Sequence, residues 1–508
     1  MFMRNTKPPL LFWQGIASTD WGKNWSLLTL RYPSVIYTLL AALMAFLLGR
    51  KLSGQPEIGA LASLTFLSFF NIYRYGRPFL TEAPMIFWTF LPIFAFLFWQ
   101  PFAVESSVVM PILLGLALGV ALLYKSFALA LPVALALAWW YLDHRRYSLK
   151  TFLVKDFGKI VVMGLVSLAL FSLWFWLDPK PMEVFREFVL KENLSRFDPR
   201  GQSYLTRLLS GVSSIWGLAL GYPVNAGLLL FPVLALFWVS FKRRKQLSSD
   251  EKMLWMWILS LFVVFSLPSV RSGRYLLSAM PAIAVLCALH WERLSRKAFV
   301  ASLLVGGTAL AAIAYLCLRL HFAIGGASLW GWSYWALLSV TFALILAGLC
   351  ASEFTRPAVP AVALLICLSL AVALRPLEGP VGRFNTDAQQ AVSGKQVWVP
   401  CNFVAVDEGY RFLLPGAEVH CYDDDGNVAL ASLDSRYAIF AIRLPLDAPE
   451  INNLRVIGQR LELRSRHNSH QLFDMLRGNV FNQLFVREFL VEVPGARPAA
   501  MPADEGRR

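Results

Sequence analysis

Charged residues are scarce in this sequence. Asp, Glu, Lys and Arg together make up 16% of the 508 residues, whereas hydrophobic residues make up 57%. A soluble domain usually has about a quarter of its residues charged, so a soluble protein is excluded for most of the chain. The long apolar runs, with 18 Trp and 38 Phe, are typical of a polytopic membrane protein with aromatic belts at both interfaces.

The sequence also lacks a signal peptide and recognisable metal motifs. The first apolar stretch, 10–17, is too short to cross a bilayer and has no cleavage site. No CxxC pair is present. The acidic turn 423–427 lacks the later Gly and Glu of a calcium loop, and His467 and His470 have no third ligand. We therefore assign no metal ligands and no cofactor, and leave a divalent metal open.

Basic residues give a net charge of +15 but do not indicate nucleic acid as a partner. They lie in short clusters between apolar runs, at Arg50-Lys51, 145–159, 241–245 and 292–297. These clusters follow alternate runs, so they fall on one side of the membrane if every run spans it. The positive-inside rule makes that side the cytoplasm.

Twelve apolar runs are long enough, or nearly so, to span a membrane. They lie at about 33–49, 57–72, 83–99, 108–122, 126–141, 159–177, 215–240, 253–268, 275–290, 298–318, 329–350 and 358–374. The pair over 108–141 is interrupted by Tyr124-Lys125-Ser126, which predicts two short helices that meet at one membrane face. We expect an α-helical polytopic membrane domain over 1–377.

The composition changes after Leu374. A polar linker is followed by strand-like runs, "QVWVP", "RYAIFAI" and "LFVREFLVEV". This predicts a soluble α/β domain over 378–494 on the outer face, followed by a disordered tail over 495–508. Cys401 and Cys421 lie in this domain and could form a disulfide in an oxidising compartment.

Outer-face loops carry dispersed cations and two carboxylates. The segments are "NTKPPLLFW" with Lys7, "NIYRYGRPFLTEAPMIFW" with Arg74, Arg77 and Glu82, the 178–214 loop with Glu192 and Arg196, and "PSVRSGRYLLSAMP" with Arg271, Arg274 and Tyr275. Because four loops on one face each supply cations, we expect a phosphate site at the lipid interface. A carboxylate there could act as a general base toward an acceptor hydroxyl, or position it.

Each outer segment also has a purely structural interpretation. Thr81 and Glu82 suit a helix start, with a capping hydroxyl and an acid at the positive end of the helix. Lys125 could snorkel to the interface. Residues 182–197 form an amphipathic pattern for a surface helix, on which Glu192 and Arg196 are spaced for an ion pair. The arginines of the fourth segment, Arg271 and Arg274, could anchor lipid headgroups.

The order of these segments resembles a known family. The sequence contains "KPPL…W", "LRYPSVIYTLLAALMAFLLGRKLSG", "YGRPFLTEAPMIFW", "GLALGVALLYKSFALALP", "ENLSRF" and "RSGRYLLSAMPAIAVL" in that order. It is similar to the bacterial polyprenyl-phosphate-dependent glycosyltransferases of the GT-C class, which are relatives of protein O-mannosyltransferases and of the 4-amino-4-deoxy-L-arabinose lipid A transferase. The resemblance extends from Lys7 to about residue 290, and beyond it only the architecture matches.

The resemblance implies a multi-pass inner-membrane enzyme. Such an enzyme takes a sugar from a polyprenyl-phosphate carrier and transfers it to a lipid, glycan or protein acceptor on the periplasmic face. Matched by position, Lys7 and Arg196 would bind the carrier phosphate. Tyr275, which follows Arg271 and Arg274, would line the same pocket.

Two further site residues, Glu82 and Lys125, are placed by the same comparison. Glu82 stands where the family usually has an aspartate in its second outer loop, and it is our candidate catalytic residue. Lys125 matches the family's lysine at the short-helix break. Arg77 and Glu192 complete the expected substrate-binding set.

One family feature is absent from this sequence. The family begins with a spanning helix and an outer loop with a catalytic acid, usually in an Asp-Glu pair, before the "KP" turn. Met1 falls after that point, and Asp20, the remaining acid of the first loop, lies on the other side of Lys7. We expect either a start placed too late, with a thirteenth helix upstream, or a truncated and inactive relative.

Other functions are less consistent with the sequence. A transporter would place ionisable groups near the bilayer midplane, whereas these spans are nearly free of charge. An O-antigen ligase or polymerase would share the lipid-linked donor, but the early "KPPL…TEAP…ENLSRF" order argues against it. A non-catalytic scaffold is the third alternative, because the first-loop acid is missing.

Overall fold

The chain forms two compact units. The computed structural model describes residues 7–24, 26–197, 203–324, 329–401, 406–423, 433, 436–446, 448, 451, 454–464 and 474–493. One unit comprises Met1–Thr308 with Thr341–Cys367, and the other comprises Ala309–Val340 with Leu368–Arg508.

Long apolar helices confirm a multi-pass membrane protein. Seven of the described helical segments have the length and composition to cross a bilayer. They are α2 (Leu27–Ser53), η1 with α8 (Phe127–Leu129, Ala130–His144), α10 (Phe157–Leu177), α13 to α14 (Ile215–Ala226, Gly227–Leu229 as η4, Leu230–Lys242), α17 (Arg296–Ala323), α18 (Trp332–Cys350) and α19 (Ser352–Glu378).

The other apolar runs form shorter or more polar helices, so the expected twelve spans are not established. Four have 10–17 residues: α3 (Pro56–Leu67), α5 (Glu82–Phe98), α7 (Val109–Tyr124), and η6 with α16 (Gly273–Ala279, Met280–Leu289). Helix α15 (Ser249–Ser266) begins with three charged residues, 250–252. Short helices connect the long ones: α1 (Leu10–Ser18), α4 (Phe70–Tyr75), α6 (Gln100–Glu105), α9 (Leu149–Lys155), α11 (Pro181–Val184), α12 (Tyr204–Leu209), η5 (Arg244–Gln246) and η7 (Trp291–Arg293).

The predicted break between two short helices is confirmed. Helix α7 ends at Tyr124, and Ser126 is extended and caps the next turn by accepting a hydrogen bond from the Ala128 amide at 3.3 Å. Helix α7 packs closely against α10. A Cβ at Gly115 would lie 2.7 Å from the Met163 carbonyl oxygen, so only glycine permits this approach.

Residues 182–197, which the sequence predicts as a surface helix, are helical but do not form one regular α-helix. This segment consists of α11, a π-helix η2 (Phe185–Asn193) and a 3₁₀ turn η3 (Leu194–Phe197). The Asn193 side-chain amide, Nδ2, donates to the Phe188 carbonyl five residues earlier at 2.7 Å, which stabilises the wider turn. Phe188 is buried and anchors this segment, with its ring centroid 5.0 Å from that of Trp174.

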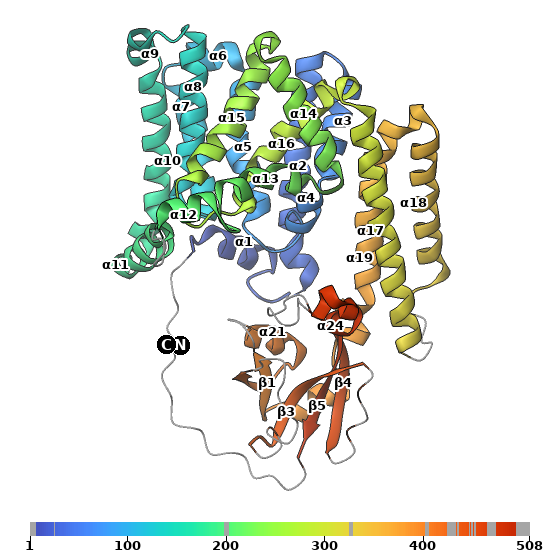
Figure 1. Cartoon of the computed structure of the whole chain (residues 1–508). Helices are drawn as coiled ribbons and strands as arrows, with labels where there is room; N and C mark the ends of the chain where they lie inside the picture. The colour runs from blue at the N-terminus through green and yellow to red at the C-terminus, as the bar shows by residue number, and fades with distance from the viewer. Residues whose placement is uncertain are drawn as a thin grey trace. The chain divides into compact units, whose positions relative to one another are not determined.

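The helix bundle of the first unit has two distinct ends. In Figure 1, α6 and α9 lie at one end and α1, α11 and α12 at the other. At the first end, the buried Asp156 accepts two hydrogen bonds from Arg145, at 2.7 and 3.1 Å, and one from Lys159 at 3.2 Å. The basic cluster 145–159 therefore includes a structural ion network besides any role in topology.

The second unit contains a five-stranded sheet in the order β2-β1-β3-β5-β4. Strand β1 is parallel to β2 and β3, whereas β5 is antiparallel to β3 and β4. Its elements are η8 (Pro380–Gly382), α20 (Thr386–Val392), β1 (Gln396–Cys401), α21 (Val406–Leu413), β2 (Glu418–Asp423), β3 (Ile439–Pro445), β4 (Arg455–Leu463), η9 (Met475–Asn479), α24 (Val480–Leu484) and β5 (Phe485–Glu492) (Figure 1). The three strand-like runs are thus confirmed as β1, β3 and β5.

Cys401 and Cys421 form a disulfide between β1 and β2. The other cysteines, in the apolar helices, are free thiols. His467, His470 and most of the acidic turn 423–427 lie outside the described residues.

Candidate active site

A cavity of about 1090 Å³ lies in the first unit. Its lining comes from α1, the start of α5, the α7–η1 break, the start of α8, α10, η2 and η3, the end of α15, and η6. Seven of the nine residues that the sequence predicts for the site line it: Lys7, Glu82, Lys125, Glu192, Arg196, Arg274 and Tyr275. The fold therefore brings together residues from all of the outer segments.

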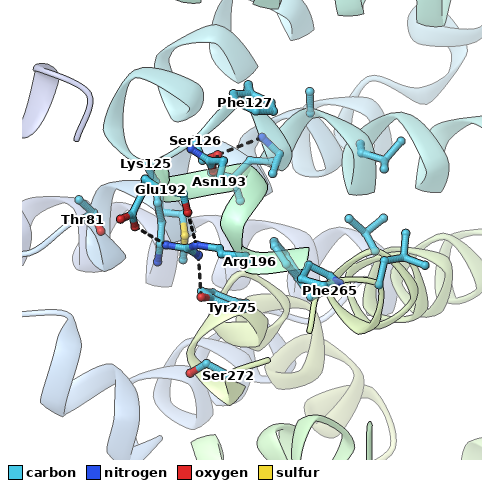
Figure 2. A pocket seen from close by; sticks show the side chains of 18 of the residues that line it. Thr81, Lys125, Ser126, Phe127, Glu192, Asn193, Arg196, Phe265, Ser272 and Tyr275 are labelled. Atoms are coloured by element: carbon cyan, nitrogen blue, oxygen red, sulfur yellow. Dashed lines mark hydrogen bonds and ion pairs between the residues drawn. The ribbon is translucent and has the colours of Figure 1, made fainter. Parts of the chain in front are cut away.

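The first cluster in this cavity is centred on the Glu192 carboxylate. Its Oε1 accepts hydrogen bonds from Lys7 Nζ at 2.6 Å and from Arg196 Nη2 at 2.5 Å. Arg196 also donates from Nη1 to the Tyr275 hydroxyl at 2.7 Å, and from Nε to the Glu192 carbonyl at 2.9 Å. Figure 2 shows Glu192, Arg196 and Tyr275 pointing toward one another. The predicted Glu192–Arg196 ion pair is present, but Lys7 shares the same oxygen.

The second cluster is centred on Glu82, which is 2% exposed. Its Oε1 accepts from Lys125 Nζ at 3.2 Å and from Arg274 Nη2 at 2.5 Å. Its Oε2 is buried and has no hydrogen-bond partner among the described residues. Thr81 occupies the N-cap position of α5 without a capping hydrogen bond. The helix-start interpretation thus does not account for the ion pairs of Glu82 with Lys125 and Arg274. Lys125 binds this acid rather than extending to the membrane interface.

The Tyr275 ring lies between the two clusters. Its centroid is 5.8 Å from Lys125 Nζ and 5.7 Å from Arg196 Cζ, within the range of cation–π attraction. Phe265 packs against the same ring, with centroids 5.1 Å apart. One aromatic side chain therefore holds a cation of each cluster at a fixed position.

The cavity carries an excess of positive charge. Its charged lining residues are the four cations and two carboxylates described above, which leaves two positive charges unbalanced. Burial by itself raises the pKa of Glu192, but the hydrogen bonds and charges of Lys7 and Arg196 outweigh burial and hold this pKa below its ordinary value of 4.5. Both carboxylates are thus engaged by cations, and an anion is the ligand that the excess charge favours.

The rest of the lining is mainly apolar. It includes Phe127, Leu129 and Leu131 after the helix break, and Met163 and Leu168 on α10. A charged end and an apolar wall in one cavity suit an amphiphile with an anionic head and a hydrocarbon tail.

Two predicted binding residues lie outside the lining. Arg271 is 4% exposed and donates to the carbonyls of Ser266, Arg207 and Ser213 at 2.7–3.2 Å. It braces three backbone segments and cannot reach headgroups as a surface anchor. The Arg77 guanidinium lies over the Tyr73 ring, 4.1 Å from its centroid. A substrate contact for Arg77 or Arg271 stays a prediction.

Asp20 is also placed away from the cavity. Its carboxylate is exposed and lies 3.9 Å from Lys23 Nζ in the turn after α1. It does not stand in for a first-loop acid in this arrangement.

Three site residues were missed by the sequence analysis. Asn193 and Ser126 line the cavity and bind each other, with the Ser126 hydroxyl donating to Asn193 Oδ1 at 2.8 Å (Figure 2). The Tyr75 ring lies beneath Arg274, 4.6 Å from Cζ to centroid. Each lies within a motif that was singled out, "ENLSRF", the helix break or "YGRP", so their positions beside charged residues were the available signal.

Within the described part of the chain, no three His, Cys, Asp or Glu side chains gather as a metal site would require. The two carboxylates of the cavity each bind cationic side chains.

Comparisons with known proteins show what the chain is similar to. The dolichyl-phosphate-mannose-protein mannosyltransferase family matches residues 4–184. The chain is 25% identical over 429 residues to undecaprenyl phosphate-alpha-4-amino-4-deoxy-L-arabinose arabinosyl transferase 2 of Proteus mirabilis (strain HI4320), a match that covers 78% of this chain and 72% of the relative. It is 27% identical over 276 residues to the arabinosyl transferase of Edwardsiella ictaluri (strain 93-146), covering 52% and 46%.

The chain is similar in sequence to these polyprenyl-phosphate glycosyltransferases. Its fold is similar to that of ArnT from Cupriavidus metallidurans bound to undecaprenyl phosphate, with a TM-score of 0.59, 18% identity, and coverage of 97% of this chain and 90% of that one. The apo form of the same protein gives a TM-score of 0.52 at 15% identity. The resemblance inferred from the ordered motifs is thus confirmed.

Proposed function

We propose that this chain transfers a sugar from a polyprenyl-phosphate carrier to a lipid, glycan or protein acceptor. The single observation that carries the proposal is that Glu192 joins Lys7 to Arg196, and Arg196 contacts Tyr275, in a cavity whose remaining wall is mainly apolar. Donor groups on a cation-rich surface suit a phosphate, and the apolar wall suits an isoprenoid chain. The relatives named for undecaprenyl phosphate support the same donor class.

The cations have a chemical role in such a transfer. When the bond between the sugar and the carrier phosphate breaks, negative charge builds on the departing phosphate. Lys7 and Arg196 would donate hydrogen bonds to it, and the fixed Tyr275 ring holds Arg196 in place before the reaction begins. Preorganised donors of this kind stabilise the developing charge more than the ground state.

Glu82 is proposed to bind the acceptor. Its Oε1 is held by Lys125 and Arg274, whereas Oε2 remains free among the described residues. That oxygen is buried while the site is empty, so it must first become exposed to the cavity. It can then accept a hydrogen bond from an acceptor hydroxyl and hold the hydroxyl oxygen near the sugar. Lys125 and Arg274 keep the carboxylate oriented.

We place the site at the periplasmic face of the bacterial inner membrane, and we expect the C-terminal sheet domain to be periplasmic. The basic clusters at the opposite end of the helices support this orientation by the positive-inside rule. The Cys401–Cys421 disulfide supports an oxidising compartment for the sheet domain.

Binding of undecaprenyl phosphate to the full chain in lipid nanodiscs tests the proposal. We expect Lys7→Met and Arg196→Met each to weaken binding by at least about tenfold, because each removes a charge-assisted hydrogen bond. Lys23→Met is the matched control, since Lys23 is exposed and lies away from the cavity. Unchanged affinity in both cavity variants would refute the phosphate site. Mass spectrometry of membrane lipids, glycans and proteins from expressing cells then identifies the acceptor.

A further inference from the structure

The Glu192 carboxylate occupies the position that an anion would take between two cations. Lys7 Nζ and Arg196 Nη2 both donate to the same oxygen, Oε1, at 2.6 and 2.5 Å. The two nitrogens therefore lie no further apart than the sum of these distances. A single phosphate oxygen could bridge the same pair, but not while Glu192 Oε1 stands between them.

Glu192 is able to leave this position. Its side chain is 27% exposed and Lys7 is 48% exposed, so neither is locked in the core. The backbone around Glu192 is fixed independently of the carboxylate, by the buried Phe188 ring and by the contact between Asn193 and Ser126. Rotation of the Glu192 side chain can thus clear the site without unfolding η2.

We infer that Glu192 is an internal competitor of the carrier phosphate, holding the empty site in place and limiting how tightly phosphate binds. This inference rests on the proposed function, because it takes Lys7 and Arg196 as phosphate ligands. Glu192 neutralises these cations when no ligand is present and must be displaced when phosphate enters. The affinity for phosphate is then lower than the two cations alone would provide.

The competition discriminates between the two states of the carrier. A sugar-linked carrier phosphate is a diester with one negative charge, whereas the free carrier phosphate left after transfer is a monoester with about 1.5 to 2 negative charges at pH 7. A displaced Glu192 carboxylate stays close to the site and repels the more highly charged monoester more strongly. Glu192 therefore favours exchange of the spent carrier for a loaded one.

The test compares Glu192→Gln with Glu187→Gln. Glu187 is the matched control, because it is a glutamate on the same π-helix, pairs with Lys191 and does not line the cavity. The full chain in nanodiscs is titrated with farnesyl phosphate as the monoester probe and with its monomethyl ester as the diester probe. We expect Glu192→Gln to bind the monoester about fivefold more tightly, to bind the diester with a smaller gain, and Glu187→Gln to match the wild type.

The sign of the effect distinguishes competition from structural support. A damaged or distorted site loses affinity, so tighter binding in Glu192→Gln cannot come from a loss of structure. Weaker or unchanged binding of the monoester in Glu192→Gln would overturn the inference, provided that Lys7→Met and Arg196→Met have lost binding. If those two variants bind normally, the proposed phosphate site itself fails.

Discussion

Arg196 Nη1 donates a hydrogen bond to the Tyr275 hydroxyl at 2.7 Å, although 79 residues separate the two. The contact joins η3 to η6, two segments that are separated along the chain by helices α12 to α15. It fixes the Arg196 guanidinium in the cavity between the Glu192 carboxylate and the Tyr275 ring. The phosphate affinity of Arg196 should therefore depend on Tyr275.

Tyr275→Phe removes this hydrogen bond but keeps the ring. We expect the affinity for undecaprenyl phosphate to fall about three- to tenfold, because hydrogen bonds to charged groups contribute about 1.5 kcal/mol or somewhat less when partly exposed. Tyr141→Phe is the control, since its hydroxyl also donates to a protein acceptor, the Ala103 carbonyl, away from this cavity. Equal affinities in the wild type and Tyr275→Phe would contradict the role of this contact.

Glu82 and Lys125 should behave as a coupled pair. Lys125→Met leaves the buried Glu82 with Arg274 as its one remaining cation among those described, and breaking a buried pair typically costs about 3–5 kcal/mol. We expect a lower melting temperature for Lys125→Met, and partial recovery in the double variant Glu82→Gln/Lys125→Met.

Measuring sugar transfer and donor affinity together tests whether Glu82 acts on the acceptor or on the donor. Glu82→Gln keeps the shape of the side chain but removes the charged acceptor of hydrogen bonds, so we expect sugar transfer to fall at least about a hundredfold. Its affinity for undecaprenyl phosphate should stay within about threefold of the wild type, since Glu82 belongs to the other cluster. A parallel loss of affinity and transfer would show that Glu82 acts on the donor side.

The stabilising effect of Glu192 should disappear in acid. The pKa of Glu192 is below 4.5 in the folded protein, so its contribution to stability is fully present above about pH 4.5 and is lost as the pH falls through the folded pKa. In the ligand-free protein, the wild type should melt about 1–2 °C above Glu192→Gln at pH 7. This difference should shrink below pH 4.5. A difference that grows in acid would contradict the ion-pair assignment.

Asp156 should matter for stability and not for phosphate binding. Its buried carboxylate neutralises Arg145 and Lys159 at the other end of the bundle, and Asp156→Asn leaves both cations without their anion. We expect unfolding to become easier by about 3–5 kcal/mol, measured by thermal denaturation in nanodiscs. The folded fraction should still bind undecaprenyl phosphate with wild-type affinity.

The disulfide should stabilise the C-terminal sheet domain. Cys401 and Cys421 close a loop with a sequence separation of 20, for which the chain-entropy relation gives about 3 kcal/mol. We expect the double variant Cys401→Ser/Cys421→Ser to melt at a lower temperature in its sheet domain, observed by differential scanning calorimetry of the full chain. Added reductant should lower the transition of the wild type and leave the variant unchanged.

The membrane architecture was readable from the sequence because hydrocarbon imposes a simple rule. A chain in a bilayer must bury its backbone groups in helices of apolar residues, and this made the runs at 33–49, 159–177 and 298–318 unmistakable as α2, α10 and α17. The break at Lys125 was visible for the same reason, since a polar triplet interrupts an apolar run. The number of spans could not be predicted from the sequence, because helices as short as α3 and α7 need neighbouring helices to cover their ends.

The residues of the site were largely predicted, but among their pairings only that of Glu192 with Arg196 was. The sequence indicated that Lys7, Glu82, Arg196 and Tyr275 face one side, because charged loops recur at alternate ends of the spans. The sequence analysis grouped Arg271 with Arg274. In the structure, Arg271 donates to backbone carbonyls of three segments, whereas Arg274 donates to Glu82. Residues three apart in an irregular loop have no fixed common direction, so spacing could not separate them.

The sequence by itself determined a polytopic helical protein with cation-rich loops on one face and a small α/β domain after Leu374. The length of an apolar run, the positions of charged residues and the alternation of a strand are properties of short segments. They can therefore be recognised without knowing how the chain folds. Only the tertiary structure decided that Lys7 and Arg196 share one oxygen of Glu192, and that Lys125 and Arg274 share one oxygen of Glu82. Such contacts join segments up to 192 residues apart, and their partners are chosen by helix packing rather than by sequence spacing.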